Sequence, residues 1–474
     1  METKDKGMES MKEIAPNKVL REMEIELRTE MRREDIRPTP KTWTGKLKAL
    51  GPTFILAGAI VGSGELIATT LLGAKIGFIM LWAIIFSCLA KIMIQEVIGR
   101  YVIVTGKGLH DMLDEVPGPR PGGMSWAVWW VILLMVSLTI VMAGIFGAQG
   151  LALKGLFGGF GNAHVLGVIA GVVGIILLYR GIYSDVEVLV VIMVISFSLG
   201  TAFLAFVGLQ YTPYPVSAAD FASGLNFNLP QAGIAVALSV FGMTGLSANE
   251  LIQYTYWAKG KGYAAWTGPR SEAGWKDRAK GWIHVMRWDL GLAAASYTIV
   301  TIAFYVMGAA VLHRMKITPG GFKLVDELAN MYTQTLGAWS SLLFMFVAFV
   351  VLYSTYIVNV AGTSRVVGDG LIKAKVLKAA DIPKVLFWRR VILIAGPVAM
   401  FILYYVFPSP AQLVVAGGIA LSASLPVIAL IAVYINHKMK REYPEMAIGP
   451  VGSVLLWLSA AVCVIFVVAG FFLM

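Results

Sequence analysis

Two short runs combine glycine with a carboxylate inside long apolar segments. The first is GSGE at residues 62–65, within the apolar stretch 54–72, and the second is the stretch 241–250, which ends at Glu250. A charged side chain in the middle of a bilayer is costly and is usually kept for binding or transport. Glycine also weakens helical backbone. We interpret both runs as places where a membrane-spanning helix unwinds around a ligand.

Both runs offer oxygen ligands. Carboxylates, an amide, hydroxyls and freed backbone carbonyls suit a hard cation such as Mg²⁺, Ca²⁺ or Mn²⁺. We expect Ser63 to cap the second half of the first interrupted helix, with Glu65 in its first turn. The carbonyls expected at the end of the first half are those of Ala59, Ile60 and Val61. The expected binding residues are Gly62, Ser63, Glu65, Met243, Ser247, Asn249 and Glu250. If the ligand is a cation, the metal ligands are Glu65, Asn249 and Glu250.

Other interpretations of these residues stay open. Either glutamate could form a buried structural ion pair with Lys91 or Arg365, and glycine also permits close packing between helices. Lys91 recurs with Glu96 and Arg100 at helical spacing, which snorkelling or pairing explains better than a proton relay does. Two glutamates beside glycine breaks in matching spans are the pattern of a transporter with inverted repeats.

The elements that must position these residues are membrane-spanning helices. The chain has 474 residues, of which 58% are hydrophobic and only 14% charged, with a mean hydropathy of +0.74. A soluble core of this length does not bury so much apolar surface, so the composition indicates an all-α integral membrane protein. At about 20 residues per crossing, the apolar material suffices for roughly ten to twelve crossings, and the apolar runs divide into eleven spans. We expect them near 48–73, 78–101, 124–152, 163–179, 187–209, 231–256, 288–312, 336–362, 387–407, 411–436 and 450–473.

The charges follow the threading of such a chain. The net charge is +11, but the basic residues fall in short loops between apolar runs, which is the positive-inside pattern and argues against nucleic-acid binding. We therefore expect a multi-pass protein of the cytoplasmic membrane, with its amino terminus in the cytoplasm. An odd number of spans then leaves Met474 outside. Cys88 and Cys463 lie in apolar runs, which argues against a disulfide framework or a thiolate metal site. No cofactor is expected.

The spans divide into two halves. Residues 1–46 form a charged cytoplasmic tail with a possible surface helix, 47–209 the first repeat and 210–436 the second, with a cytoplasmic loop at 257–287. Residues 437–474 add a loop and the eleventh span. The interrupted spans are then the first of each five-helix repeat and face opposite ways, which is inverted-repeat geometry.

Several stretches resemble the Nramp family of divalent-metal transporters, in order and spacing. They are Gly51-Pro52-Thr53-Phe54, Gln95-Glu96 through Arg100 to Val104-Thr105-Gly106-Lys107-Gly108-Leu109, Ala309-Ala310-Val311-Leu312-His313, Val360-Ala361-Gly362 and Leu421-Ser422-Ala423-Ser424-Leu425-Pro426. The resemblance covers residues 47–440 and implies a LeuT-like fold, with broken first and sixth helices and transport by alternating access.

The departures from the family fall on its chemistry. The family's Asp-Pro-Gly-Asn corresponds to residues 62–65. Its Met-Pro-His-Asn corresponds to residues 246–249, or to residues 247–250 if the register shifts by one, which places Glu250 at the family's asparagine. The third-span acids that serve proton movement fall on Val141 and Gly144, and the tenth-span glutamine near the ion falls on Gly418. Fold and transport therefore carry over from the resemblance, whereas transition-metal selectivity and proton coupling do not.

The leading hypothesis is a secondary active or facilitated transporter of a divalent cation of the Mg or Mn class. The transport alternative is a small organic solute in the same site, since glycines in place of side chains leave room for one. A membrane-embedded enzyme or a receptor is the alternative of another class, and no nucleophile–base set or appended soluble domain favours it. We expect that the chain is not an enzyme.

Overall fold

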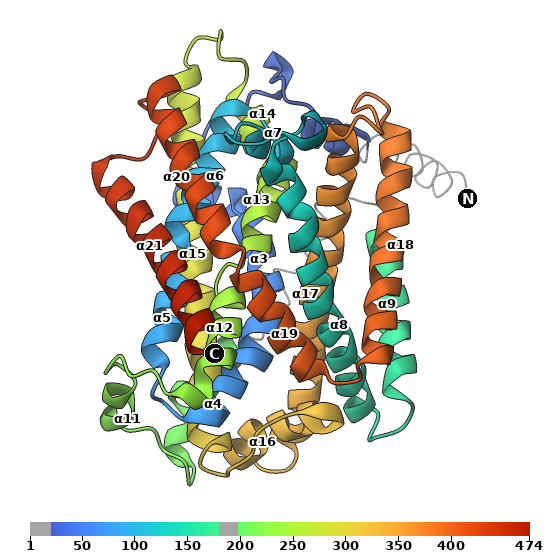
Figure 1. The fold of residues 1–474 in the computed structure, drawn as a ribbon, viewed down its shortest axis with the longest axis vertical. Coiled ribbons are helices and arrows are strands. Elements are labelled where there is room, and N and C mark those ends of the chain that lie inside the picture. The colour runs from blue at the N-terminus through green and yellow to red at the C-terminus, as the bar shows by residue number, and fades with distance from the viewer. Residues whose placement is uncertain (1–19, 180–197) are drawn as a thin grey trace, which may run out of the picture.

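The computed structural model describes residues 20–179 and 198–474, with backbone alone for Val61, Ser63, Phe322 and Thr335. Every regular element in these ranges is a helix (Figure 1). Nine helices there are long and apolar enough to span a membrane, and a tenth apolar helix, Ala163–Leu178, is shorter. The remaining expected span, 187–209, lies partly outside the described residues, and its described part is helical over 198–206.

Several spans consist of two or three helical pieces. The first crossing contains α3 (Pro52–Ile60), the π-helix η2 (Val61–Thr69) and α4 (Thr70–Ile76), the second α5 (Leu81–Ala90) and α6 (Ile92–Thr105), the sixth α12 (Ile234–Met243) and α13 (Ala248–Lys261), and the tenth α19 (Pro410–Ser422) and α20 (Leu425–Glu442). The other spans are α8 (Trp126–Leu156), α9 (Ala163–Leu178), α15 (Trp275–Met307) with the π-turn Gly308–Leu312, α17 (Ser340–Lys373), α18 (Ile382–Val406) and α21 (Pro450–Leu473).

Short helices lie at the two ends of the spans. They are α2 (Trp43–Ala49), α7 (Leu109–Asp114) and α14 (Tyr263–Thr267) at one end, and α11 (Ala218–Ser223) and α16 (Leu324–Leu336) at the other. The carboxyl terminus lies toward the α11 and α16 end (Figure 1). The seventh span begins at Trp275, earlier than the expected 288, so much of the expected loop 257–287 is helical.

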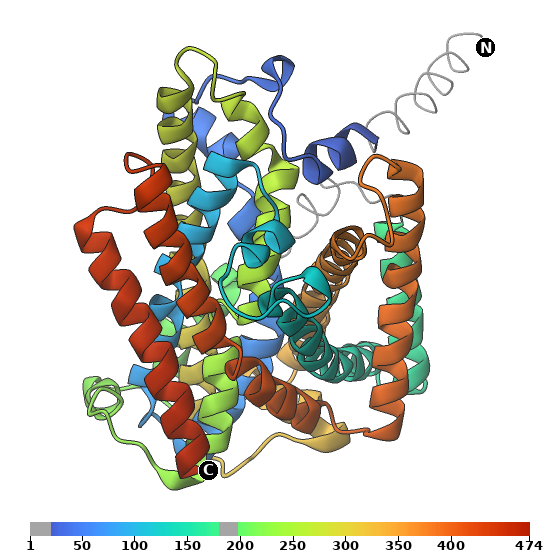
Figure 2. The same ribbon diagram turned by 45° about the horizontal axis from the view of Figure 1, so that its top comes forward.

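The first and sixth crossings lie in the middle of the molecule. The π-helix of the first crossing contacts α12, α15, α17 and α19. A second group of helices forms around α8, which packs against α9, α17, α18 and α19. Figure 2 shows α8, α9, α17 and α18 together on one side of the first and sixth crossings, and α17 also packs against α3 and the π-helix of the first crossing. The two crossings that carry the glycine–glutamate runs are therefore enclosed by other spans.

The start of the first crossing is fixed by Asp289 of α15. Its two carboxylate oxygens accept hydrogen bonds from the backbone N–H groups of Gly51 and Thr53, at 2.7 and 2.8 Å. The first N–H groups of a helix have no partner within the helix, and a carboxylate there also interacts favourably with the helix dipole. Asp289 therefore positions α3 relative to the seventh span.

The described part of the amino-terminal tail packs on the protein. Residues 20–27 are helical, and Glu26 is buried against Arg389 and Arg365, at 2.7 and 3.2 Å. Burial alone would raise the pKa of Glu26, but the charges of Arg389 and Arg365 lower it below its ordinary value. The tail is therefore more than a solvated segment, because two buried arginines of α17 and α18 need its carboxylate.

Candidate functional site

The sixth crossing is broken, as the sequence predicts. Its two helices, α12 and α13, are separated by the four non-helical residues 244–247. Gly245 has φ +65°, and a Cβ at this position would lie 2.9 Å from the Cα of Cys88 in α5. Glycine is required here both for the left-handed backbone conformation and for the close approach of the second span.

The second half of the sixth crossing begins with a capping box. The Ser247 hydroxyl accepts a hydrogen bond from Asn249 N at 3.0 Å, and Glu250 Oε2 accepts one from Ser247 N at 2.9 Å. Glu250 Oε1 lies 3.4 Å from the amide nitrogen of Asn249. Both oxygens of Glu250 therefore have partners within the start of α13, which is a structural role beside the expected one as a ligand.

The first crossing is interrupted at residues 61–69, as expected, but by a π-helix and not by unwound backbone. The backbone of Val61–Thr69 continues as a π-helix, so Ala59 and Ile60 lie within helical backbone rather than at the end of a half-helix. The glycines allow close packing instead: a Cβ at Gly62 would lie 2.8 Å from the carbonyl oxygen of Val351, and one at Gly64 would lie 3.1 Å from that of Met243. The expected capping role of Ser63 concerns a side chain outside the described atoms.

Glu65 links the first crossing to the break in the sixth crossing. Its side chain has no exposed surface, and Oε1 accepts hydrogen bonds from Thr301 Oγ1 at 2.9 Å and from Gly245 N at 3.3 Å. Its other oxygen, Oε2, is buried and has no hydrogen-bond partner among the described residues. Glu65 and Glu250 thus accept N–H groups of residues 245 and 247 in the same break. A buried carboxylate oxygen without a donor is a strong acceptor for a cation.

A chain of amide side chains continues from the break toward α17. The amide nitrogen of Asn249 donates to Asn359 Oδ1 at 2.7 Å, and Gln253 Nε2 donates to Asn249 Oδ1 at 3.1 Å. Asn359 in turn donates to the carbonyl of Thr355 at 3.0 Å. The Thr355 hydroxyl accepts from Gly62 N, also at 3.0 Å. This chain joins the expected residues Asn249 and Gly62 through the eighth span.

Four residues of this arrangement were not expected from the sequence: Thr301, Gln253, Asn359 and Thr355. Thr355 and Asn359 lie four residues apart in a largely apolar span, and Gln253 lies four residues after Asn249, so helical spacing could have indicated all three. Thr301 has no such relation to an expected site residue, and only the packing of α15 against the first crossing shows that it faces Glu65.

Met243 occupies the space beside Gly418. The methionine is buried, and a Cβ at Gly418 would lie 2.7 Å from its terminal methyl carbon and 3.0 Å from its sulfur. At Gly242, an added Cβ would lie 2.8 Å from the backbone nitrogen of Ser422. The space beside these glycines is therefore occupied by neighbouring helices, and the glycines do not enclose a large empty space.

The buried ion pair that Lys91 or Arg365 could form with a site glutamate is absent among the described residues. Arg365 binds Glu26. The Lys91 ammonium instead donates to the carbonyls of Phe241 and Thr244, at 2.6 and 2.7 Å. Within the described ranges, no group of three or more His, Cys, Asp or Glu residues is placed to hold a metal ion. A cation at the break would therefore have at most the two carboxylates Glu65 and Glu250 beside neutral oxygens.

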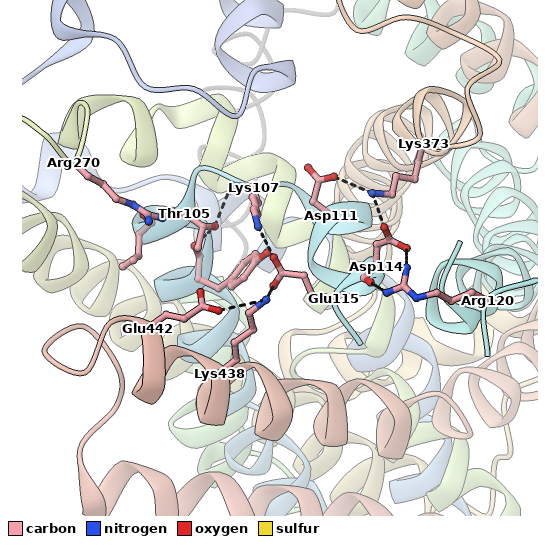
Figure 3. Close-up of polar contacts among 12 residues, drawn as sticks. Thr105, Lys107, Asp111, Asp114, Glu115, Arg120, Arg270, Lys373, Lys438 and Glu442 are labelled. Carbon is pink, nitrogen blue, oxygen red and sulfur yellow. Dashed lines mark hydrogen bonds and ion pairs between the residues drawn. The ribbon is translucent and has the colours of Figure 1, made fainter. Parts of the chain in front are cut away.

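The α7 end of the molecule is closed by ion pairs between elements (Figure 3). Lys373 of α17 lies 3.2 Å from Asp111 and 3.0 Å from Asp114 of α7. Lys438 of α20 lies 3.2 Å from Glu115, which follows α7. Such partly exposed pairs contribute about 0–1 kcal/mol each. They can therefore exchange partners when these helices move relative to one another.

Enclosed spans, a broken sixth crossing and a buried carboxylate at the break define a polytopic membrane transporter of the LeuT-fold class. The family model described as "Nramp: Natural resistance-associated macrophage protein-like" matches residues 53–473. The chain belongs to this family, which confirms the resemblance in the sequence, and it is a transporter.

Individual relatives and solved structures agree with this assignment. An uncharacterized protein of Pasteurella multocida is 25% identical over 88% of this chain and 90% of its own length. The divalent metal cation transporter MntH of Caldanaerobacter subterraneus is 23% identical over 86% of this chain and 90% of its own. The fold is similar to that of a mutant of the Eremococcus coleocola manganese transporter, with a TM-score of 0.65, 16% identity, and coverage of 94% of this chain and 92% of the other. At this low identity, the likeness to the solved structure supports the fold alone.

Proposed function

We propose that this protein carries a hard divalent cation of the Mg²⁺ or Mn²⁺ class across the cytoplasmic membrane by alternating access. Its relatives named as MntH are divalent metal cation transporters. The observation that carries the proposal for this chain is the unpartnered Oε2 of Glu65 at the break. The carboxylate is the primary ligand, and oxygens of the broken segment and of the amide chain complete the coordination.

In this proposal Glu250 is a secondary ligand. Its Oε2 is engaged by Ser247 N and its Oε1 by Asn249, so it contributes negative charge near the ion and fixes the start of α13. Asn249 stays a proposed ligand through its Oδ1, which already accepts from Gln253. Gly62 acts through its packing on α17, and Ser247 through its cap.

The cation is favoured over a small organic solute. The organic alternative requires that glycines leave room in the site. Gly62, Gly242 and Gly418 are instead packed against neighbouring helices. A bare ion needs far less space than a solute, and oxygen ligands without an added sulfur favour hard ions. Met243 carries a sulfur beside the break, and its removal tests the selectivity.

The orientation follows from charge. The loops and helix ends at the α7 and α14 end carry Lys107, Arg120, Arg270 and Lys276, and basic residues of short loops stay in the cytoplasm. We infer that this end, together with the residues before α3, is cytoplasmic. The ion pairs of α7 with α17 and α20 then form the inner gate.

Calorimetric titration of the purified protein with Mg²⁺, Mn²⁺ and Cd²⁺ tests the proposal. We expect binding of Mg²⁺ or Mn²⁺ by the wild type, its loss in Glu65→Gln, and its retention in Glu34→Gln, a control at an exposed glutamate. Met243→Ala should leave the order of affinities unchanged. Unchanged binding by Glu65→Gln, or much tighter Cd²⁺ binding that Met243→Ala abolishes, would contradict the proposal.

A further inference from the structure

Lys91 is a buried charge at the junction of α5 and α6. Its side chain has no exposed surface, and no described carboxylate pairs with it. Its ammonium has three N–H donors and meets three acceptors: Phe241 O at 2.6 Å, Thr244 O at 2.7 Å and Ser87 Oγ at 3.0 Å. The Phe241 ring centroid lies 4.8 Å from the same nitrogen. A charge without a counterion is costly to bury, so these oxygens must stabilise it.

The acceptors belong to the end of the first half of the sixth crossing. Phe241 lies in the last turn of α12 and Thr244 follows it, where carbonyls lack helical partners and carry the negative end of the helix dipole. The Ser87 hydroxyl also lies 2.7 Å from Thr244 Oγ1 and 3.3 Å from Thr244 O. Two carbonyls and one hydroxyl thus surround the nitrogen of Lys91, and the Thr244 hydroxyl lies beside that of Ser87.

Such a set of neutral oxygens is what an alkali cation requires. In transporters with broken helices, the carbonyls at the end of a half-helix coordinate the coupling ion. We propose that Lys91 is a tethered cation that occupies such a site, so that the wild-type protein binds no separate alkali ion at the end of α12. Lys91 is a positioning residue, because it acts on the break and does not contact the substrate.

The site of Lys91 is adjacent to that of Glu65. Lys91 binds the carbonyl of Thr244, and Glu65 accepts the N–H of the next residue, Gly245. A positive charge here stabilises the break and offsets part of the negative charge that attracts the substrate. The inference deepens the proposed function and rests on it, since it assigns the ion requirement of the same broken helix.

Removing the tethered charge should open the site to a free cation. In Lys91→Ala and Lys91→Ser, we expect the Tm of the purified protein to rise saturably with NaCl relative to N-methyl-D-glucamine chloride at equal ionic strength. The wild type should show no such difference. Lys91→Met, which fills the space without a charge, should be less stable than the wild type and insensitive to sodium. Melting needs no transport, so this test is independent of the proposed substrate.

A second measurement separates a tethered ion from a merely structural lysine. In Lys91→Ala, the affinity for Mn²⁺ should depend on sodium, whereas in the wild type it should not. The proposal is overturned if the Tm of Lys91→Ala and Lys91→Ser is the same in Na⁺, K⁺, Li⁺ and N-methyl-D-glucamine. A saturable sodium dependence of the wild type overturns it as well. Failure of both variants to fold in NaCl and in KCl also overturns it, because a free cation should replace the tethered one.

Discussion

The first and sixth crossings carry similar sequence signals and have different backbones. Each combines glycines with a glutamate in an apolar run, yet residues 61–69 form a continuous π-helix while residues 244–247 leave the helix entirely. The difference lies in what the glycines do. Gly245 adopts a left-handed conformation, whereas Gly62 and Gly64 serve as contact points for α17 and α12. Glycine therefore predicts an irregular helix, and its surroundings decide the form.

The two glutamates differ in the same way. Glu250 accepts the Ser247 N–H and the Asn249 side-chain amide at the start of its own helix, while Glu65 reaches from another span and keeps one oxygen without a partner among the described residues. One crossing thus supplies a self-contained cap and the other supplies a carboxylate with free capacity. The continuous helix of the first crossing therefore supplies the charged ligand, and the broken helix of the sixth crossing supplies the neutral oxygens.

The largest expected effect distinguishes the two carboxylates. Glu65→Gln should lower uptake into proteoliposomes at least about a hundredfold, because loss of a charge–charge contact at a buried site costs several kcal/mol. Glu250→Gln should lower it only a few fold, because glutamine also forms a capping box. Both variants should keep a Tm near that of the wild type. Equal losses in the two variants would remove the distinction between ligand and cap.

The next effect concerns the glycines of the two crossings. Gly245→Ala should destabilise the protein by about 1–3 kcal/mol, because alanine is strained at φ +65° and would crowd the second span. Gly64→Ala should cost about 1 kcal/mol, since its helical backbone accepts alanine and the carbonyl of Met243 needs only a small shift. Thermal unfolding in detergent measures both. A larger loss for Gly64→Ala would show that the packing of the π-helix matters more than the break.

A smaller effect is expected at the hydrogen bond that orients Glu65. Thr301→Val keeps the shape of the side chain and removes the donor 2.9 Å from Glu65 Oε1. A hydrogen bond to a charged group contributes about 1.5–3 kcal/mol, so cation affinity should fall about tenfold. Thr301→Ser restores the donor and should restore the affinity. Titration of both variants with Mn²⁺ checks this, and unchanged affinity in Thr301→Val would show that Gly245 N alone fixes the carboxylate.

The smallest expected effect is that of a proton gradient. The third span has no acid or histidine between Val131 and Leu151, and a Cβ at Gly144 would lie 2.7 Å from the carbonyl of Pro410. A carboxylate relay has neither residues nor space there. Uptake should therefore change little with an imposed proton gradient, as a pH-reporting dye in proteoliposomes can measure. Acidification in a fixed ratio to uptake would show another proton route, with Glu65 as the first residue to test.

The sequence by itself determined the membrane class and the sixth-crossing break, and its resemblance to the Nramp family implied the LeuT-like fold. Apolar runs of sufficient length specify membrane spans. A turn and a capped helix are specified by the glycine at 245 and by the serine and glutamate that follow it, three residues apart. These are local properties of the chain, so no contact with other spans is needed to infer them. Glu65 was also identifiable, because an acid inside an apolar run needs a function.

Only the tertiary structure decided which partners these residues have. The π-helix of the first crossing depends on the closeness of Val351 and Met243, and the use of Lys91 as a cap for α12 depends on where the second span passes. The role of Thr301 follows from the packing of α15 against the first crossing, which brings its hydroxyl to Glu65. Local sequence fixes where backbone groups and charges lose their partners, and the packing of distant spans decides what satisfies them.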